Sequence, residues 1–188
     1  FIYWAGDEYI PTQLQQLAPA SRLLAFADAP EAGAAAYAEN GLLTIDQPTP
    51  FTMALSELSL PGRHNLRNSM AAALAAQSAG VDEATIRAGL ADFSGVPHRL
   101  EKVADVAGVH YVNDSKATNV DACYCALESM QTPVVLILGG TDKGNDYNEI
   151  TPLVREKCRA LVFLGADNSK LQDFFADFNL PISDTHSM

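Results

Sequence analysis

The chain has 188 residues, 48% of them hydrophobic and 19% charged, which is typical of a globular protein of one or two domains with a real core. Its formal net charge of −11 excludes a basic nucleic-acid-binding surface, because no basic stripe is present to neutralise phosphates. An anionic substrate would have to be held by local cations against an unfavourable overall field.

The three cysteines, Cys123, Cys125 and Cys158, form neither an even disulfide set nor a zinc-binding spacing. We expect all three to be small buried thiols of a cytoplasmic protein. The longest apolar run is too short for a membrane span, and no signal peptide is recognised before the first expected strand. Because the sequence starts directly in a strand-like segment and stops in polar residues, we expect it to be a piece of a longer protein.

The first half of the chain alternates between expected strands and helices. The strands are residues 1–5, 22–27, 41–45 and 54–60, and the helices are residues 11–17, 65–79 and a segment that follows Asp82. Gly80 is expected to end the second helix and Asp82 to cap the third. Residues 95–97, Gly-Val-Pro, break the pattern, so we predict a boundary between a domain of residues 1–95 and a domain of residues 96–188.

The second half alternates as a doubly wound α/β domain does. A hairpin of residues 100–106 and 109–112 is followed by expected helices at residues 120–130, 147–157 and 169–178 and by expected strands at residues 133–138 and 160–165. Residues 133–138 form a continuous apolar run, which predicts a strand buried on both faces of its sheet.

Residues 62–68 form the first of three polar clusters at element junctions. Asn65 and Asn68 are three positions apart near the start of a helix, so both side chains lie on one helix face. A pair of amides presents donors and acceptors together, which suits the edge of a purine ring. Alternatively, Asn65 is only the N-cap of the helix.

The second cluster is His98 and Arg99, at the predicted domain boundary. Domain interfaces are favoured ligand sites, so this pair could contact phosphates. The alternative is a solvated loop.

The third cluster combines residues 113–119, Asn-Asp-Ser-Lys-Ala-Thr-Asn, with the loop of residues 139–144. Both follow strands that we expect in the same sheet, where ligands of open α/β sheets bind. Asp114, Lys116 and Thr118 supply an acceptor, a cation and a hydroxyl beside a helix N-terminus, and Lys143 supplies a second cation. The alternative for the first segment is a loop with an Asn or Thr N-cap.

Several common catalytic motifs are absent from the sequence. The loop of residues 139–144 lacks the Gly-x-x-x-x-Gly-Lys-Ser/Thr spacing of a P-loop, and no other segment supplies it. Neither His-Glu-x-x-His nor Gly-x-Ser-x-Gly is present.

The order and spacing of these clusters resemble the bacterial Mur ligase family. The resemblance covers residues 55–165, and it includes residues 60–65 with Asn68, residues 95–99, residues 113–119 and Gly139-Gly140 with Asp142-Lys143. The Asp-Ser-Lys-Ala-Thr-Asn form, with Lys116 after the serine, is similar to the D-glutamate-adding branch of the family.

The resemblance implies an ATP-dependent ligase that joins D-glutamate to UDP-N-acetylmuramoyl-L-alanine in peptidoglycan synthesis, with Mg²⁺ as a cofactor. It implies an α/β fold in which the end of a central P-loop-type ATPase domain precedes a Rossmann-like C-terminal domain. By the same resemblance, Asn65 and Asn68 face adenine, Asp114 accepts from the ribose hydroxyls, and Arg99 meets the ATP phosphates. His98 and Lys116 are the catalytic candidates, and Lys116, Thr118 and Lys143 hold D-glutamate.

The family's P-loop and its magnesium ligands are not among these residues. We therefore expect the chain alone to be inactive and the complete protein to be a monomer. Two alternatives remain open. One is another Mur-type or folylpolyglutamate-synthase-type ligase, and the other is a stand-alone α/β module that binds a nucleotide or an acidic metabolite without catalysis.

Overall fold

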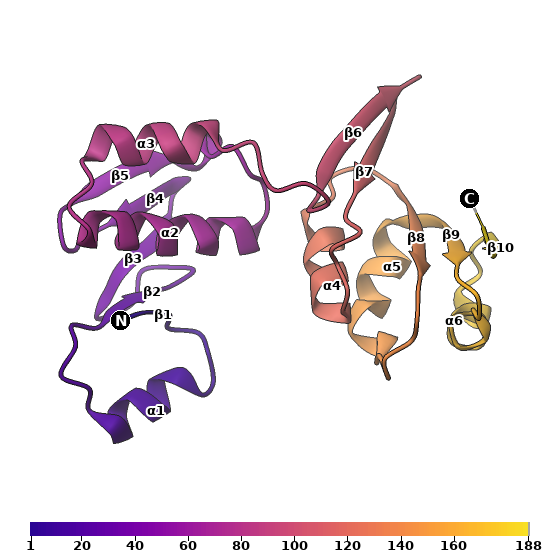
Figure 1. Ribbon diagram of the computed structural model, residues 1–188, viewed down its shortest axis with the longest axis horizontal. Helices are drawn as coiled ribbons and strands as arrows, with labels where there is room; N and C mark the ends of the chain where they lie inside the picture. The colour runs from indigo at the N-terminus through magenta and orange to yellow at the C-terminus, as the bar shows by residue number, and fades with distance from the viewer. Residues whose placement is uncertain (188) are drawn as a thin grey trace. The chain divides into compact units, whose positions relative to one another are not determined.

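The computed structural model describes residues 1–187 and divides into two compact units, Phe1–Gly95 and Val96–Met188 (Figure 1). The division falls at the residue where the sequence predicts a domain boundary. Strands and helices alternate in both units, which confirms the expected α/β class.

The first unit is built on a five-stranded sheet of order β1-β2-β3-β4-β5. The strands are β1 (Ile2–Trp4), β2 (Leu24–Phe26), β3 (Ala34–Glu39), β4 (Leu42–Ile45) and β5 (Phe51–Ala54). The first three are parallel to one another, and β4 is antiparallel to both of its neighbours. The helices are α1 (Ile10–Leu17), α2 (Arg63–Ser78) and α3 (Glu83–Asp92).

Helix α2 supplies the centre of the first core. Met70, Ala73 and Leu74 repeat at helical spacing and are fully buried, because this face of α2 packs on the sheet. Arg67 on the same helix forms an ion pair with Asp28 and stacks over the Trp4 ring at 3.7 Å from its centre. These contacts fix the start of α2, which carries the predicted adenine-facing residues.

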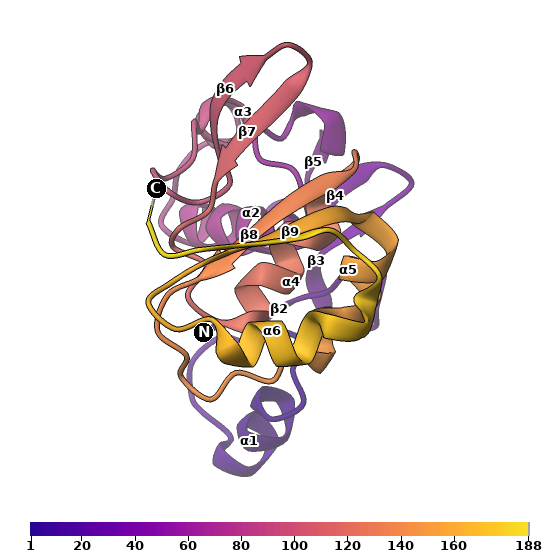
Figure 2. The ribbon, with the colours of Figure 1, turned by 90° about the vertical axis from the view of Figure 1, so that its right-hand side faces the viewer.

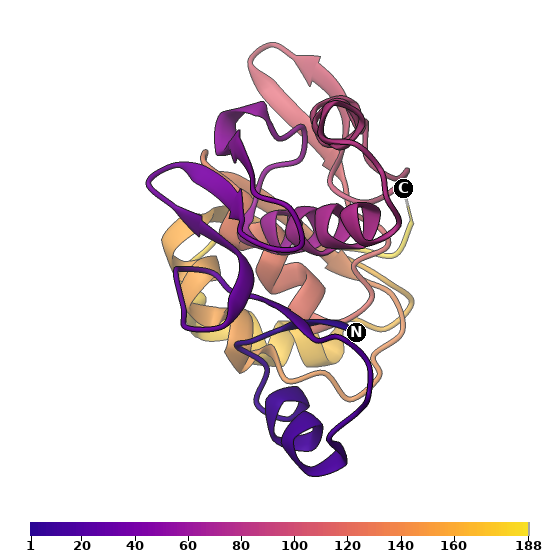
Figure 3. The ribbon, with the colours of Figure 1, turned by 90° about the vertical axis from the view of Figure 1, so that its left-hand side faces the viewer.

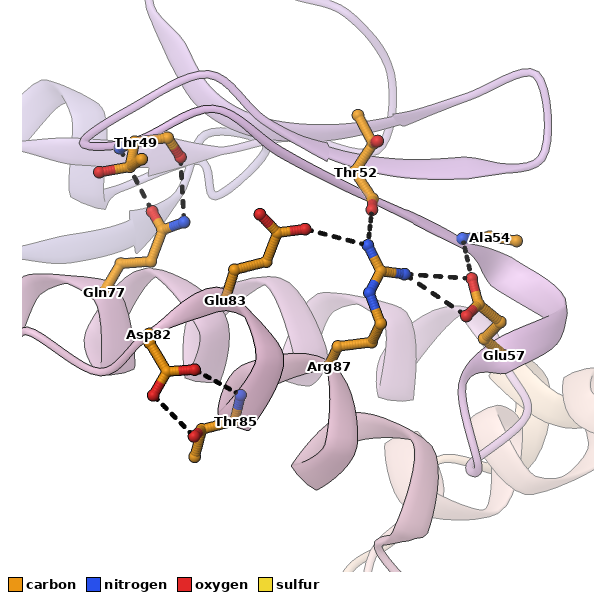
Figure 4. A network of polar contacts seen from close by, with 9 residues as sticks. All are labelled: Thr49, Thr52, Ala54, Glu57, Gln77, Asp82, Glu83, Thr85 and Arg87. Atoms are coloured by element: carbon orange, nitrogen blue, oxygen red, sulfur yellow. Dashed lines mark hydrogen bonds and ion pairs between the residues drawn. The ribbon is translucent and has the colours of Figure 1, made fainter.

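Helix α3 is joined to the edge strand β5 through Arg87, as Figure 4 shows. The Arg87 guanidinium donates to the Thr52 carbonyl at 2.5 Å and pairs with Glu57 and Glu83, each at 3.3 Å. Asp82 caps α3 by accepting from the Thr85 amide at 2.9 Å, so the predicted cap is confirmed.

Helix α1 lies apart from the five-stranded sheet in Figures 1 and 3, and none of its residues is buried. Leu17, the last residue of α1, is 72% exposed. The helix therefore adds little to the core of the first unit.

Two predictions for the first unit are wrong. The segment expected as a strand at residues 54–60 is instead the end of β5 followed by a 3-10 turn, Leu55–Glu57, which is closed by the Glu57 carboxylate accepting from the Ala54 amide at 2.9 Å. Strand β3 was not predicted, because its Ala-rich sequence carries no alternation of polar and apolar residues.

The second unit contains a hairpin and a three-stranded parallel sheet of order β10-β9-β8 (Figure 2). The hairpin strands are β6 (Glu101–Val106) and β7 (Val109–Asn113), and the sheet strands are β8 (Val134–Gly139), β9 (Cys158–Leu164) and β10 (Ile182–Thr185). The helices are α4 (Val120–Ser129), α5 (Thr151–Lys157) and α6 (Ser169–Phe175), with 3-10 turns at Tyr147–Ile150 and Ala176–Phe178.

The interpretation of residues 133–138 as a strand buried on both faces is wrong for the described residues. Leu127, Val154 and Phe175, one from each helix, share a single core, so the helices cover one face of the sheet. On β8 the alternate residues Val135 and Ile137 are 60% and 64% exposed. An apolar run alone does not reveal which face neighbouring elements cover.

The cysteine prediction holds only in part. Cys158 is buried, whereas Cys123 and Cys125 are partly buried, and all three are free thiols. Burial raises the pKa of Cys123 and of Cys158 to about 11, so neither is poised as a thiolate nucleophile.

Candidate active site

Residues 113–119 connect β7 to α4 through two tight turns. The Asn113 side-chain oxygen accepts from the Ser115 amide at 3.0 Å, and the Ala117 amide donates to the Asp114 carbonyl at 2.8 Å. Asn119 then caps α4 by accepting from the Ala122 amide at 2.8 Å. The helix-cap alternative is thus correct for Asn119, which leaves Asp114, Lys116 and Thr118 in the preceding loop.

A second loop, which carries His98 and Arg99, is joined to these turns by three hydrogen bonds. The Lys116 amide donates to the His98 carbonyl at 3.1 Å, and the Leu100 amide donates to the Asp114 carboxylate at 3.0 Å. The Asn113 amide nitrogen lies 2.8 Å from His98 Nδ1. The structure therefore brings His98 and Arg99 together with Asp114 and Lys116.

The loop that carries His98 has an unusual backbone conformation. His98 and Leu100 adopt left-handed backbone angles, with φ of 66° and 46°. The Glu101 carboxylate accepts from the His98 amide at 2.8 Å and thereby holds this turn. Because the His98 side chain is 53% exposed, it remains accessible to a ligand.

Lys143 lies in the loop that follows β8, and its neighbour Asp142 organises that loop. The Asp142 carboxylate accepts from the amides of Gly144 and Asn145, at 3.2 and 3.3 Å, and forms an ion pair with Lys170 at 3.0 Å. The hydrogen bond from Lys170 holds the pKa of Asp142 below its usual range. Lys143 itself is exposed.

The Lys143 loop and the start of α4 lie at the same end of the second unit. The Lys157 ammonium donates to the carbonyls of Leu127, Glu128 and Met130, which places the end of α4 at the start of β9. The start of β9 in turn pairs with the start of β8. Since α4 packs along α5 and the 3-10 turn at Tyr147–Ile150, its first turn points toward the carboxyl ends of β8 and β9.

The expectation that these two segments follow strands of one sheet is wrong. Strand β7 pairs only with β6 among the described residues, and β8 belongs to the separate parallel sheet. Lys116 and Lys143 nevertheless lie at the same end of the second unit. Lys116 precedes the first turn of α4, and Lys143 follows the carboxyl end of β8.

Asn65 and Asn68 belong to the first unit, on the first two turns of α2. Gly62 is the N-cap of α2, so the alternative that Asn65 is the cap is wrong. Asn65 is partly buried and donates to the Pro61 carbonyl at 2.7 Å, whereas Asn68 is exposed. Each side chain still has amide groups that could face a ligand.

Three further side chains hold the candidate residues in place: Glu101 and Lys170, which sequence reasoning missed, and Asn113, which it included in the polar cluster without a role of its own. The position of Lys170 could have indicated a role outside its helix, because a cation in the first turn of a helix is unfavourable for the helix dipole. The contact between Asn113 and His98 was not visible in the sequence, because the two residues are 15 positions apart. The contact of Glu101 with the His98 amide depends on the left-handed turn between them, which no motif indicated.

Two kinds of feature are absent from residues 1–187. No group of three or more His, Cys, Asp or Glu side chains is placed to hold a metal ion. No helix in this range is long and apolar enough to cross a membrane.

Residues 98–186 match the family of the Mur ligase glutamate ligase domain. The chain is 52% identical over 187 residues to a UDP-N-acetylmuramoylalanine–D-glutamate ligase of Bacteroides thetaiotaomicron, and this match covers 100% of the chain and 42% of the relative. A ligase of the same name from Porphyromonas gingivalis is 48% identical over 191 residues, with the same coverage. The chain thus spans less than half the length of these relatives.

Solved structures show the same fold at low sequence identity. A MurF structure from Acinetobacter baumannii matches with a TM-score of 0.71 and 18% identity, over 97% of this chain and 42% of that one. A folylpolyglutamate synthase from Mycobacterium tuberculosis, complexed with ADP and AMPPCP, matches with a TM-score of 0.67 and 15% identity, over 96% of this chain and 43% of that one.

Proposed function

Because the chain belongs to the Mur ligase family, we propose that it is part of an ATP-dependent ligase that adds D-glutamate to UDP-N-acetylmuramoyl-L-alanine in peptidoglycan synthesis. Residues 1–95 would be the end of the central ATP-binding domain, and residues 96–188 the larger part of the glutamate-binding domain. The complete enzyme would act as a monomer in the cytoplasm, where ATP is available.

The observation that carries this proposal is the pair of exposed lysines at one end of the second unit. Lys116 and Lys143 come from separate loops of a chain with a net charge of −11. The net negative charge of the chain repels an anionic substrate, so such a substrate must be bound by local cations. We assign them, with Thr118, to the two carboxylates of D-glutamate.

We assign the nucleotide contacts residue by residue, as the family resemblance implies. Asn65 and Asn68 offer amide groups to adenine, and Arg99 offers a guanidinium to the phosphates. Asp114 would accept from the ribose hydroxyls. One Asp114 oxygen already accepts from the Leu100 amide, and the carboxylate has further lone pairs for this contact.

In the reaction that the family implies, ATP phosphorylates the carboxylate of UDP-N-acetylmuramoyl-L-alanine to an acyl phosphate. The amine of D-glutamate then forms the C–N bond, a proton leaves the nitrogen, and the C–O bond to phosphate breaks. His98 would lie beside the reacting centre, and Lys116 would stabilise the anionic oxygens of the tetrahedral intermediate.

Magnesium supplies charge neutralisation on phosphates in such ligases. The resemblance places the family's magnesium ligands outside this chain, so we assign none of its residues to the ion.

The test is release of phosphate from ATP by the full-length protein. We expect release to require both UDP-N-acetylmuramoyl-L-alanine and D-glutamate. Equal activity with diaminopimelate, L-lysine or a folate acceptor would favour another ligase of this fold, and nucleotide binding without turnover would favour a non-catalytic module. The chain of residues 1–188 alone should release no phosphate above background, and measurable ATP-dependent release by it would contradict the proposed division of the site.

A further inference from the structure

Lys170 lies in the first turn of α6 and directs its donors at the loop that carries Lys143. Its ammonium group donates to the two Asp142 carboxylate oxygens at 3.1 and 3.0 Å and to the Asn145 carbonyl at 2.8 Å. Its nitrogen also lies 5.4 Å from the centre of the Tyr147 ring. One lysine therefore contacts two residues of the loop after β8 and the first residue of the 3-10 turn that follows this loop.

These contacts close a turn with Lys143 at its tip. The Asp142 carboxylate accepts from the amides two and three positions further on, those of Gly144 and Asn145. Lys170 binds Asp142 before the tip and Asn145 after it. The two sides of the turn are thus joined by a single ammonium group.

Lys170 also determines what Lys143 can bind. An unpaired Asp142 carboxylate next to Lys143 would compete for the Lys143 ammonium and repel an incoming carboxylate. Asp142 is instead paired with Lys170, and no ion pair of Lys143 occurs within residues 1–187. Lys143 therefore keeps its charge available.

The position of Lys170 in the first turn lowers the stability of α6. A cation in the first turn faces the positive end of the helix dipole. The partners that offset this cost, Asp142 and Asn145, lie outside the helix. The lysine thus stabilises the loop rather than the helix.

We propose that Lys170 is a positioning residue, which neutralises Asp142 and joins the two sides of the turn so that Lys143 is held free for a carboxylate of the incoming amino acid. This inference rests on the proposed function, because the assignment of Lys143 to D-glutamate comes from there. A preformed turn reduces the entropy lost when the substrate binds.

The test uses the full-length ligase with Lys170→Met, Lys170→Arg and the double change Lys170→Met with Asp142→Asn. Lys170→Met should raise the KM for D-glutamate about tenfold, the effect of one lost charge-assisted hydrogen bond, and leave kcat within about twofold. The KM for ATP should not change. Lys170→Arg should restore most of the affinity, and the double variant should recover part of it because the competing carboxylate is gone.

A second measurement does not depend on activity. Amide hydrogen exchange over residues 139–147 of the full-length protein should accelerate in Lys170→Met, because Gly144 and Asn145 donate to the carboxylate that Lys170 holds. The matched control is Lys102→Met, which removes an exposed Lys–Asp pair of 2.5 Å in the hairpin and should change neither the exchange nor the KM.

An unchanged KM for D-glutamate in Lys170→Met, in an enzyme that uses D-glutamate, would overturn the inference. Unchanged exchange over residues 139–147 would overturn the anchoring itself. A wild-type enzyme that does not use D-glutamate would instead refute the proposed function, and the exchange experiment would still decide whether Lys170 holds the loop.

Discussion

At the scale of single residues, neighbouring polar side chains hold the candidate residues in place. Asn113 is the main example. Its oxygen accepts from the Ser115 amide, which fixes the orientation of the side-chain amide, so that its NH₂ group faces His98 Nδ1 at 2.8 Å. Nδ1 must then be the acceptor, and the proton of the neutral imidazole lies on Nε2.

Changing Asn113 to Asp should reverse this tautomer. A carboxylate cannot donate to Nδ1, so the proton is expected to move from Nε2 to Nδ1 in the neutral ring. Long-range ¹H–¹⁵N NMR spectra distinguish the two tautomers directly. Protonation of Nδ1 in the neutral wild-type ring would show that Asn113 does not orient His98 in this way.

Gly144 should be intolerant of alanine for a conformational reason. Its φ is +81°, and a Cβ there would meet no atom within 4 Å, so the penalty comes from the backbone alone. We expect Gly144→Ala to destabilise the turn by about 1–2 kcal/mol and to raise the KM for D-glutamate.

Urea unfolding and glutamate kinetics measure these two effects. Gly89→Ala is the matched control, since Gly89 lies inside α3 with equal free space and no unusual φ. This change should stabilise the protein by about 0.5–1 kcal/mol. Equal effects of the two substitutions would mean that the left-handed angle of Gly144 is not required.

At the scale of elements, the helix ends are held by polar and charged side chains. Lys157 binds the last carbonyls of α4, Asn119 caps its first turn, and Asp82 caps α3. The Asp82 cap was predictable from local sequence, and so was the end of α2 before Gly80, although the C-cap is Ala79 and Gly80 is the left-handed residue after it. The contact of Lys157 was not, because its three acceptors lie 27 to 30 residues earlier in the chain.

The Asp82 cap should make the stability of the first unit depend on pH. The Thr85 amide is the main group that lowers the pKa of Asp82 from its usual 3.8 in the folded state. A lowered folded-state pKa stabilises the protein above the unfolded-state pKa, and this contribution is lost as pH falls through the lower folded-state pKa.

Asp82→Ala should therefore be less stable than the wild type at pH 7, and the difference should shrink as the pH falls through 3.8 and below. Urea unfolding at a series of pH values, followed by a probe in the first unit, measures it. A difference that stays constant from pH 7 to pH 3 would contradict the role of the ionised cap.

At the scale of the whole molecule, the order of elements and the division near residue 95 were predictable, since each depends on local patterning and on the Gly-Val-Pro break. The separate hairpin and the exposed face of β8 were not, because pairing and burial are decided by elements far apart in sequence. Likewise, motif spacing was enough to propose Lys116 and Lys143 as candidates, but the Lys170 contact that holds the Lys143 loop required the folded structure.

The central claim is that Lys116 and Lys143 bind D-glutamate in the complete ligase. Steady-state kinetics of the full-length Lys116→Ala and Lys143→Ala variants test it, with Lys102→Ala as the control. Each of the two variants should raise the KM for D-glutamate about tenfold or more, with a much smaller change in the KM for ATP, as expected for a lost charge-assisted contact. Unchanged glutamate kinetics in both variants would contradict the account.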